Sequence, residues 1–442
     1  MSEGSPHVVV IGGGFTGLAA AYQLTKRGAR VTVLERDSSL GGLAGGFDVG
    51  GHKLERFYHH WFNNDVHIAD LVREIGCEDQ VVVRPTRTGM YYAQHFYQLS
   101  SPIDLIKFTP LNLLDRLRLG WLVIAARAVT DWTKLDHLTA REWLIKTCGR
   151  EVYRVVWEPL LVGKFGPYAD QVSAVWFWKK IALRGGSRSP HGREMLAYYK
   201  GGFAALADTL GDRITEAGAE IRLNTPATGL NLKGNRVEAV EVEGERLSVD
   251  AVLATAALPQ IADLIAPHLP AYAASLRRIR YLANVCLILV LDRSLSDTYW
   301  LNVGDPSFPF VGIIEHTNFE PPASYGGRHI VYLSKYLPTD DPLYRMTADE
   351  ALVFALPHIQ RMFPDFERDW IRAHYVWHAD YAQPIMERRY CSIVPPVETP
   401  LTNFFISTMA QVYPEDRGTN YAIRDGRAAA ERMLDRLEDC SS

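Results

Sequence analysis

Cysteine is scarce in this chain, and the few that occur are widely separated. The 442 residues include five cysteines, with no CxxC pair among them: Cys77, Cys148, Cys286, Cys391 and Cys440. Their odd number and their spacing argue against a disulfide framework and against a zinc site, so we expect no metal. A cytoplasmic location, where thiols stay reduced, fits this pattern best.

The chain also lacks a dominant charge and a long apolar run. Its formal net charge of −4 at pH 7 gives no general attraction to nucleic acid, which we exclude as a partner. No stretch reaches the roughly 18 uninterrupted apolar residues of a spanning helix. The start, "MSEGSPHVVVIGGG", has no basic segment followed by an apolar one. We therefore expect neither a signal peptide nor a transmembrane helix.

What the chain does have is length and an ordinary globular composition. Hydrophobic residues make up 47% and charged residues 22%, close to the average for soluble domains. A chain of this length is two to three times a usual domain, so we expect at least two packed units.

The first motif is "HVVVIGGGFTGLAAAYQLTKRGARVTVLER", residues 7–36. It predicts a buried strand, a glycine turn, an amphipathic helix and a second strand. Gly12, Gly14 and Gly17 form GxGxxG at the turn, where backbone N–H groups and the helix N-terminus can meet a pyrophosphate. Phe15 and Thr16 open the helix and belong to the same predicted site.

An acid and a second glycine cluster follow. Glu35 lies 18 residues after Gly17, where a carboxylate can accept both hydroxyls of an adenosine ribose and disfavours a 2′-phosphate. Gly41 and Gly42 come soon after, and they predict either a close approach of the backbone to the rest of an extended ligand or a plain turn.

Three segments carry a family resemblance. "GGGFTGLAAAYQLTKRGARVTVLERDSSLGGLAGGF" resembles the N-terminal signature of the FAD-dependent superfamily of amine oxidases, protoporphyrinogen oxidases and phytoene desaturases. "YYKGGFAALADTLGDRITEAGAEIRLNTPATGL" is similar to its second FAD-contacting segment, and "RGTNYAIRDGRAAAERM" to its C-terminal motif. The resemblance spans most of the chain and implies one FAD, held noncovalently.

The resemblance also implies the residues that contact FAD. It places Ala227 near the adenine and the C-terminal motif near the flavin. The full predicted set is Gly12, Gly14, Phe15, Thr16, Gly17, Glu35, Arg36, Gly41, Gly42, Leu43, Ala227, Gly418, Thr419 and Asn420.

The predicted fold class is α/β, with a Rossmann-like FAD-binding domain, an interleaved α+β substrate domain and a helical insertion. The FAD-binding domain is expected in three parts, 1–90, 195–270 and 396–442. Residues 91–194 read as the helical insertion, with a helix starting at Pro110 after a Thr109 cap. Residues 271–395 read as the sheet and helices of the substrate domain.

Four residues are candidates for catalysis. His59, in "FYHHWF" soon after the FAD segments, either accepts the proton that leaves with a hydride or belongs to a core turn with satisfied histidines. Glu315 and His316 lie on a predicted strand, where they form either part of a cleft or a buried structural pair. Arg417, beside Gly418, could stabilise reduced flavin, bind an anionic substrate, or simply form a salt bridge.

The helical segment "FTPLNLLDRLRLGWLVIAARAVTDW" mixes apolar residues with arginines. It either covers the substrate domain or makes a peripheral membrane contact suited to a lipid-like substrate.

The resemblance implies an oxidoreductase that moves a hydride from a C–H or C–N centre of a small-molecule or lipid-like substrate onto flavin N5. The alternatives are a redox-neutral enzyme resembling UDP-galactopyranose mutase, acting on a sugar nucleotide or glycosyl lipid, and a flavin-bound scaffold without turnover. The sequence leaves open the substrate, the electron acceptor (oxygen, a quinone or a protein) and the oligomeric state.

Overall fold

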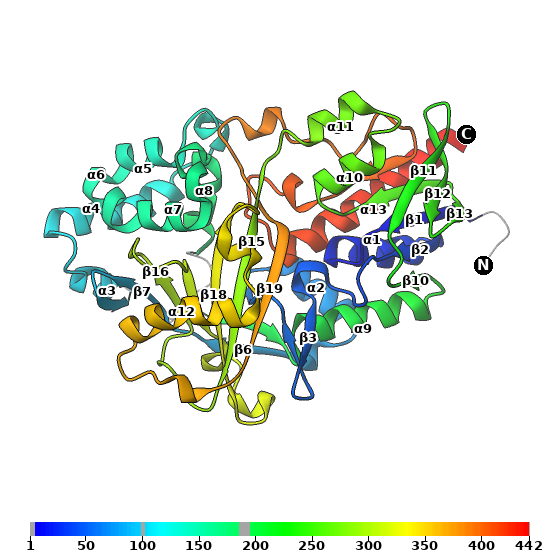
Figure 1. Cartoon of the computed structure of the whole chain (residues 1–442). Coiled ribbons are helices and arrows are strands. Elements are labelled where there is room, and N and C mark those ends of the chain that lie inside the picture. The colour runs from blue at the N-terminus through cyan, green and yellow to red at the C-terminus, as the bar shows by residue number, and fades with distance from the viewer. Residues whose placement is uncertain (1–4, 99–101, 185–194, 442) are drawn as a thin grey trace.

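A parallel sheet lies at one end of the molecule (Figure 1). The computed structural model describes residues 5–98, 102–184 and 195–441. The five strands run in the order β10-β2-β1-β14-β20, and all neighbouring pairs are parallel. Parallel strands buried on both faces need continuous apolar runs, as in "HVVVI" and "AVLA". Their bounds are β1 His7–Ile11, β2 Arg30–Leu34, β10 Glu220–Arg222, β14 Ala251–Ala254 and β20 Phe404–Ile406.

Helices cover this sheet. α1 is packed between α9, β2 and α13, and α13 also contacts α2. A small antiparallel meander of β11, β12 and β13 lies beside them, and α10 contacts β11. The bounds are α1 Phe15–Lys26, α2 Val66–Glu74, α9 Gly202–Glu216, α10 Leu258–Ile265, α11 Pro270–Leu276, α13 Thr419–Ser441, β11 Ala227–Lys233, β12 Arg236–Val242 and β13 Glu245–Ser248.

A second, mixed sheet of seven strands stands next to the first in the order β19-β15-β18-β17-β16-β7-β8. β16 and β7 pair in parallel, and the other pairs are antiparallel. α12 packs on β15 and β19. The bounds are β7 Thr88–Tyr92, β8 His95–Gln98, β15 Tyr281–Leu291, β16 Trp300–Val303, β17 Gly312–Glu315, β18 His329–Leu337, β19 Ile371–Pro384 and α12 Ala348–Met362.

Two small sheets connect these units. β3 pairs with β4, and β9 pairs with both β5 and β6. The bounds are β3 Gly46–Val49, β4 His52–Glu55, β5 Trp61–Phe62, β6 Val81–Pro85 and β9 Met195–Tyr199.

A block of helices occupies the far end from the parallel sheet (Figure 1). Its bounds are α3 Pro102–Lys107, α4 Leu113–Arg127, α5 Ala140–Cys148, α6 Arg150–Val152, α7 Glu158–Phe165 and α8 Ala174–Arg184. The predicted helix start at Pro110 is wrong. Pro110 lies in a turn, and α4 begins at Leu113 because the Asn112 side chain caps it by accepting the Asp115 N–H at 2.9 Å.

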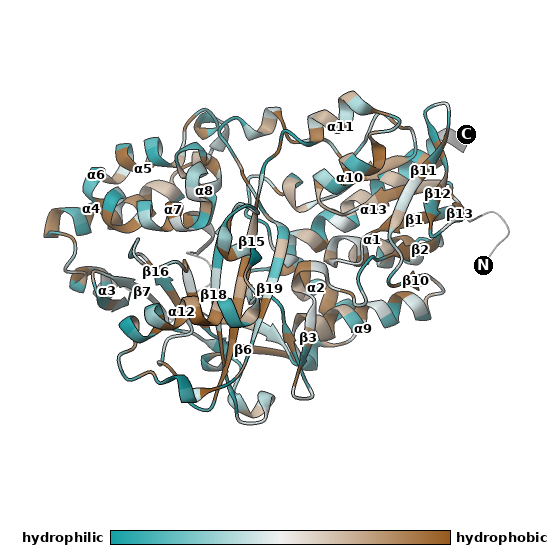
Figure 2. Cartoon of the chain, in the orientation of Figure 1, coloured by the Kyte–Doolittle hydropathy of each residue, from teal (hydrophilic) through white to brown (hydrophobic). Residues whose placement is uncertain are grey.

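The core of the second sheet is centred on β15, all of whose residues except Tyr281 are buried. Figure 2 shows its apolar run in the middle of the molecule. Because this strand is covered on both faces, it reads as a continuous hydrophobic stretch rather than an alternating one.

The first sheet takes its strands from three separated predicted segments, 1–90, 195–270 and 396–442, as an interrupted domain requires. The predicted boundary at residue 90 falls inside β7, which joins the second sheet. The domain ranges themselves stay a prediction.

Candidate functional site

The site is built on the glycine turn between β1 and α1. Gly12 has a φ of +114°, and its N–H donates to the Leu34 carbonyl at 2.8 Å. A Cβ at Gly17 would lie 1.9 Å from the Gly12 carbonyl oxygen. A side chain at Gly17 would therefore push the first turn of α1 away from the strand end.

The second glycine cluster packs directly on the first. The Gly41 N–H donates to the Gly13 carbonyl at 2.9 Å, and a Cβ at Gly42 would lie 3.3 Å from the Gly14 Cα. Gly41, at φ +102°, precedes the short 3₁₀ turn Gly42–Ala44. The pair thus brings two stretches of backbone together, a role that the sequence did not show. A contact of the same pair with FAD stays a prediction.

Glu35 is buried at the end of β2. Its carboxylate accepts the Gly13 N–H at 2.6 Å and the Asp37 N–H at 2.8 Å. Burial raises the pKa of Glu35, and the two backbone N–H groups oppose that rise. The carboxylate retains free lone pairs, so these bonds leave room for the predicted ribose hydroxyls.

The predicted adenine side lies alongside Glu35. The Thr225 N–H donates to the Glu35 carbonyl at 2.8 Å, and Ala227 begins β11 two residues later. Arg36 is exposed and lies 3.8 Å from the Asp37 carboxylate. Neither placement conflicts with the predicted contacts.

The residues present fit a dinucleotide. α1 is 12 residues long, its N-terminus has no side-chain cap, and its first turn has no acidic residue, which leaves N–H groups and the positive helix end for a pyrophosphate. A Cβ at Gly418 would meet nothing within 4 Å, so the start of α13 faces open space.

α13 is held against α1 by a close contact. A Cβ at Gly426 would lie 2.2 Å from the Thr16 carbonyl oxygen. This contact brings residues 418–420 to the side of the sheet where α1 begins. Asn420 is committed to another helix there, since its Oδ1 accepts the N–H groups of His67 at 2.9 Å and Ile68 at 3.2 Å and so caps α2.

A cavity of about 430 Å³ opens beside these motifs. Leu43, Arg417, Gly418, Thr419 and Asn420 all line it, so two of the three family-like segments reach it. The other lining residues come from the helical block, from the segment 57–65 and from the second sheet. Aromatic and aliphatic members of that lining include Phe57, Tyr58, Trp157, Leu160, Leu161, Phe165, Trp176, Phe177 and Trp300.

His59 lines this cavity as a neutral imidazole. Its Nδ1 lies 2.6 Å from the Phe57 carbonyl oxygen, which can only accept, so Nδ1 carries the proton and Nε2 is the basic atom. Burial, with a smaller contribution from nearby Arg417, lowers the pKa of His59 to about 4, and the hydrogen bond with the Phe57 carbonyl opposes this shift. Desolvation of the ring disfavours the charged imidazolium and so lowers the pKa of His59.

Arg417 is held by neutral partners. Its Nε donates to the side-chain oxygen Oε1 of Gln383 at 3.1 Å, and its guanidinium donates to the Tyr336 hydroxyl at 2.8 Å. Within the described ranges no carboxylate lies within salt-bridge distance of this guanidinium. The simple salt bridge to Glu415 or Asp416, one of the sequence alternatives, is therefore not formed.

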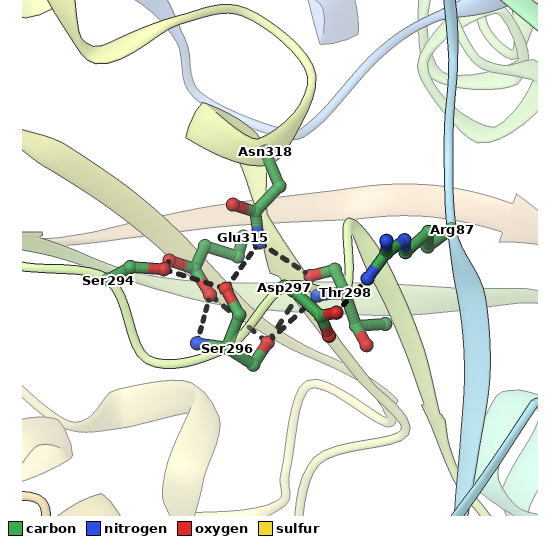
Figure 3. Close-up of polar contacts among 7 residues, drawn as sticks. All are labelled: Arg87, Ser294, Ser296, Asp297, Thr298, Glu315 and Asn318. Carbon is green, nitrogen blue, oxygen red and sulfur yellow. Dashed lines mark hydrogen bonds and ion pairs between the residues drawn. The ribbon is translucent and has the colours of Figure 1, made fainter.

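Glu315 does not line the cavity. Its carboxylate accepts the N–H groups of Leu295 at 3.0 Å and Ser296 at 2.8 Å, and it also bonds the hydroxyls of both flanking serines, Ser294 and Ser296. Figure 3 shows the side chain pointing into this turn, where Asn318 bonds the same segment. Glu315 fits the structural alternative, as the anchor of a turn.

His316 is also outside the cavity lining. It is fully buried, and its Nε2 lies 2.7 Å from the Tyr325 hydroxyl. Burial lowers the pKa of His316 to about 3. Its position again matches the buried structural alternative.

Sequence reasoning missed the charged wall of the cavity. Lys164 on α7 and Lys180 on α8 both contact the Asp416 carboxylate, at 3.3 and 2.9 Å. Each lysine is more than 200 positions from Asp416, so no motif connects them. Apolar spacing places the lysines on helices, but only the packing of the helices shows that they face one carboxylate.

Comparisons with known proteins agree with this site. The model of the family described as flavin containing amine oxidoreductase matches residues 15–434. A coproporphyrinogen III oxidase from Propionibacterium freudenreichii subsp. freudenreichii is 24% identical, over 66% of this chain and 64% of its own length. A phytoene dehydrogenase from Streptomyces griseus is 26% identical, over 60% of this chain and 57% of its own length. This chain thus matches less than two thirds of the length of these relatives.

A solved structure of reduced UDP-galactopyranose mutase is similar in fold. It has a TM-score of 0.74 and 14% identity, with 98% of this chain and 96% of the other covered. The match confirms the predicted fold class, and the family match confirms FAD as the cofactor.

We expect the FAD to be bound without a covalent bond. Cys77, Cys148 and Cys286 are buried, the exposed Cys391 does not line the cavity, and His59 Nδ1 is hydrogen-bonded, so none of them has the features of an attachment site. Acid precipitation of the purified protein should release all the flavin absorbance into the supernatant. Yellow colour remaining in the washed pellet would contradict this prediction.

Proposed function

Because the chain belongs to the flavin-containing amine oxidoreductase family, we propose that it removes a hydride from a C–H or C–N centre of a small organic or lipid-like substrate. The observation that carries this proposal is the cavity of about 430 Å³, which reaches the cofactor motifs at Leu43 and Gly418. Bound FAD supplies the hydride acceptor, N5 of its isoalloxazine ring.

The walls of the cavity suit an apolar substrate. Trp157, Leu160, Phe165 and Phe177 line it from the helical block, and Trp300 lines it from β16. Such side chains bind hydrocarbon and aromatic groups and keep water from a reacting centre. The names of two relatives, a coproporphyrinogen III oxidase and a phytoene dehydrogenase, support a substrate with a large organic body.

His59 is the proposed acceptor of the proton that leaves with the hydride. Its Nε2 is the basic atom of the ring, and the hydrogen bond from Nδ1 to the Phe57 carbonyl fixes the tautomer. With a pKa of about 4, the imidazole is neutral at physiological pH and ready to accept. A base this weak contributes less than one with a pKa near 7.

Replacing His59 with Ala should slow flavin reduction by about 10²-fold, at the low end of the range for general bases, while FAD content is kept. In the wild type, the base-dependent rate should stay level from pH 8 to about pH 5 and fall as pH approaches the pKa of about 4. Anaerobic stopped-flow spectroscopy measures both. His60→Ala is the matched control, because His60 lines the same cavity but bonds the Tyr299 hydroxyl. Equal rates in the wild type and His59→Ala would remove His59 as the base.

The proposed reaction is tested by anaerobic mixing of the holoprotein with amines, isoprenoids, tetrapyrroles, sugar nucleotides and glycosyl lipids. We expect at least one apolar compound to bleach the flavin spectrum, because hydride transfer reduces the ring. Turnover of a sugar substrate only after the flavin has been reduced would instead support the second candidate. No response from any compound would favour a flavin-bound scaffold.

The second candidate is redox-neutral chemistry on a sugar nucleotide or glycosyl lipid, resembling that of UDP-galactopyranose mutase. Two lysines in the cavity, Lys164 and Lys180, favour it, because ammonium groups bind phosphate. The many aromatic side chains of the lining favour the first candidate, hydride removal from an apolar substrate.

A peripheral membrane contact is the third part of the proposal. α4 exposes Leu113, Leu117, Trp121 and Ile124 on one face, each more than half exposed. Monomeric proteins rarely expose apolar side chains so densely. Residues 106–127 carry four basic residues and one acid, Asp115, which is buried and paired with Arg118. This apolar face with a basic surround fits an anionic bilayer surface. No described helix has the length and apolarity to cross a bilayer.

Vesicle flotation tests the membrane contact. The protein should float with phosphatidylcholine vesicles that contain phosphatidylglycerol, and Trp121→Glu should stay in solution, because a charge on this face opposes insertion. Val353→Glu is the matched control, since Val353 is equally exposed but lies on α12. Equal flotation of both variants, or none by the wild type, would contradict the contact.

A further inference from the structure

One wall of the cavity gathers cations around a single carboxylate. Asp416 accepts the Trp176 indole N–H at 2.9 Å and the Arg417 backbone N–H at 3.1 Å. The ammonium groups of Lys180 and Lys164 lie 2.9 and 3.3 Å from its carboxylate. All five residues line the cavity.

The positive charges of this wall exceed the negative charge that they share. Among the described residues of this wall, Lys164, Lys180 and the Arg417 guanidinium carry three positive charges, and Asp416 carries one negative charge. The hydrogen-bond partners of the Arg417 guanidinium, Gln383 and Tyr336, are both neutral, so they add no negative charge to the wall. A cluster with excess charge in a partly desolvated cavity attracts an anion.

Asp416 is held in its ionised form by the same three cations. Burial alone would raise the pKa of Asp416, but Lys164, Lys180 and Arg417 outweigh burial and hold that pKa well below its usual range. Burial lowers the pKa of Lys164, and Arg417 adds to that effect while Asp416 opposes it. An anion bound here would relieve the repulsion between the cations.

The aromatic side chains beside the cations indicate that the ligand also has an apolar part. The ammonium groups of Lys164 and Lys180 each lie 4.7 Å from the centroid of the Trp176 ring. Phe165 packs edge-on against Trp176 at 4.9 Å, and Phe177 and Trp157 continue the aromatic lining. The charged wall therefore borders an apolar space directly.

We propose that Lys164, Lys180 and Arg417 form an anion-binding subsite, which takes a carboxylate or phosphate group of a substrate whose apolar part fills the rest of the cavity. The inference deepens the proposed function and rests on it for taking this cavity as the substrate cavity. Asp416 and Trp176 position the two lysines, and Gln383 and Tyr336 position the arginine.

Calorimetry of the FAD-loaded protein with small aromatic probes tests the subsite. The probes are 1-naphthoate, 1-naphthyl phosphate and the neutral 1-naphthalenemethanol. Both anions should bind the wild type more tightly than the alcohol. Lys180→Met should weaken binding of the anions by about tenfold or more, as expected for loss of a charge-assisted contact, and leave the alcohol unchanged. Comparing the two anions shows whether the subsite prefers carboxylate or phosphate.

Two further variants control this experiment. Lys179→Met removes the neighbouring charge on α8, which pairs with Glu415 at 3.4 Å and does not line the cavity, so anion binding should be unchanged. Lys180→Arg keeps the charge and should keep most of the binding, even if Lys180→Met folds poorly.

Two results would exclude the anion subsite without bearing on the proposed hydride removal. Equal affinity of the wild type for the anions and the alcohol would exclude an anion subsite. A Lys180→Met protein with less bound FAD but unchanged naphthoate affinity would show that the cations serve the cofactor instead. Either result leaves bleaching of the flavin by a neutral substrate, the test of the proposed function, free to succeed or fail.

Discussion

The structure depends on close backbone contact at the glycine turn after β1. Three segments meet there: the start of α1, the second glycine cluster and α13. A Cβ at Gly17 or Gly426 would lie about 2 Å from a backbone oxygen of the turn or of α1. Glycine at these positions lets residues 418–420 and Leu43 reach one cavity, although nearly 400 positions separate them.

The cavity takes its character from the units that surround it. The unit around the parallel sheet supplies Leu43, which follows β2, and the start of α13, and the helical block supplies lysines and aromatic rings. The segment 57–65 supplies His59, whose ring proton lies on Nδ1 because Nδ1 donates to the Phe57 carbonyl. A neutral imidazole, an apolar lining and a cationic wall therefore lie around one cavity, although they come from different parts of the fold.

Three polar side chains of types that often act in catalysis or binding have structural roles in this protein. Glu315 anchors a turn, His316 bonds Tyr325, and Asn420 caps α2. Each residue type can also act in catalysis or binding, and a sequence cannot separate the two roles. The difference lies in which hydrogen bonds the side chain has already made, because a carboxylate satisfied by four donors has little capacity left for a substrate.

The sequence by itself determined the βαβ unit, the interrupted α/β organisation and the glycine motifs, because apolar periodicity and glycine spacing act over short distances. It also singled out His59 and Arg417, which the structure brings to the same cavity. Only the tertiary structure decided the cap of α4, the desolvation that lowers the pKa of His59, and the meeting of Lys164 and Lys180 at Asp416. Desolvation and ion pairing depend on neighbours from distant segments, and those neighbours are fixed by packing rather than by local pattern.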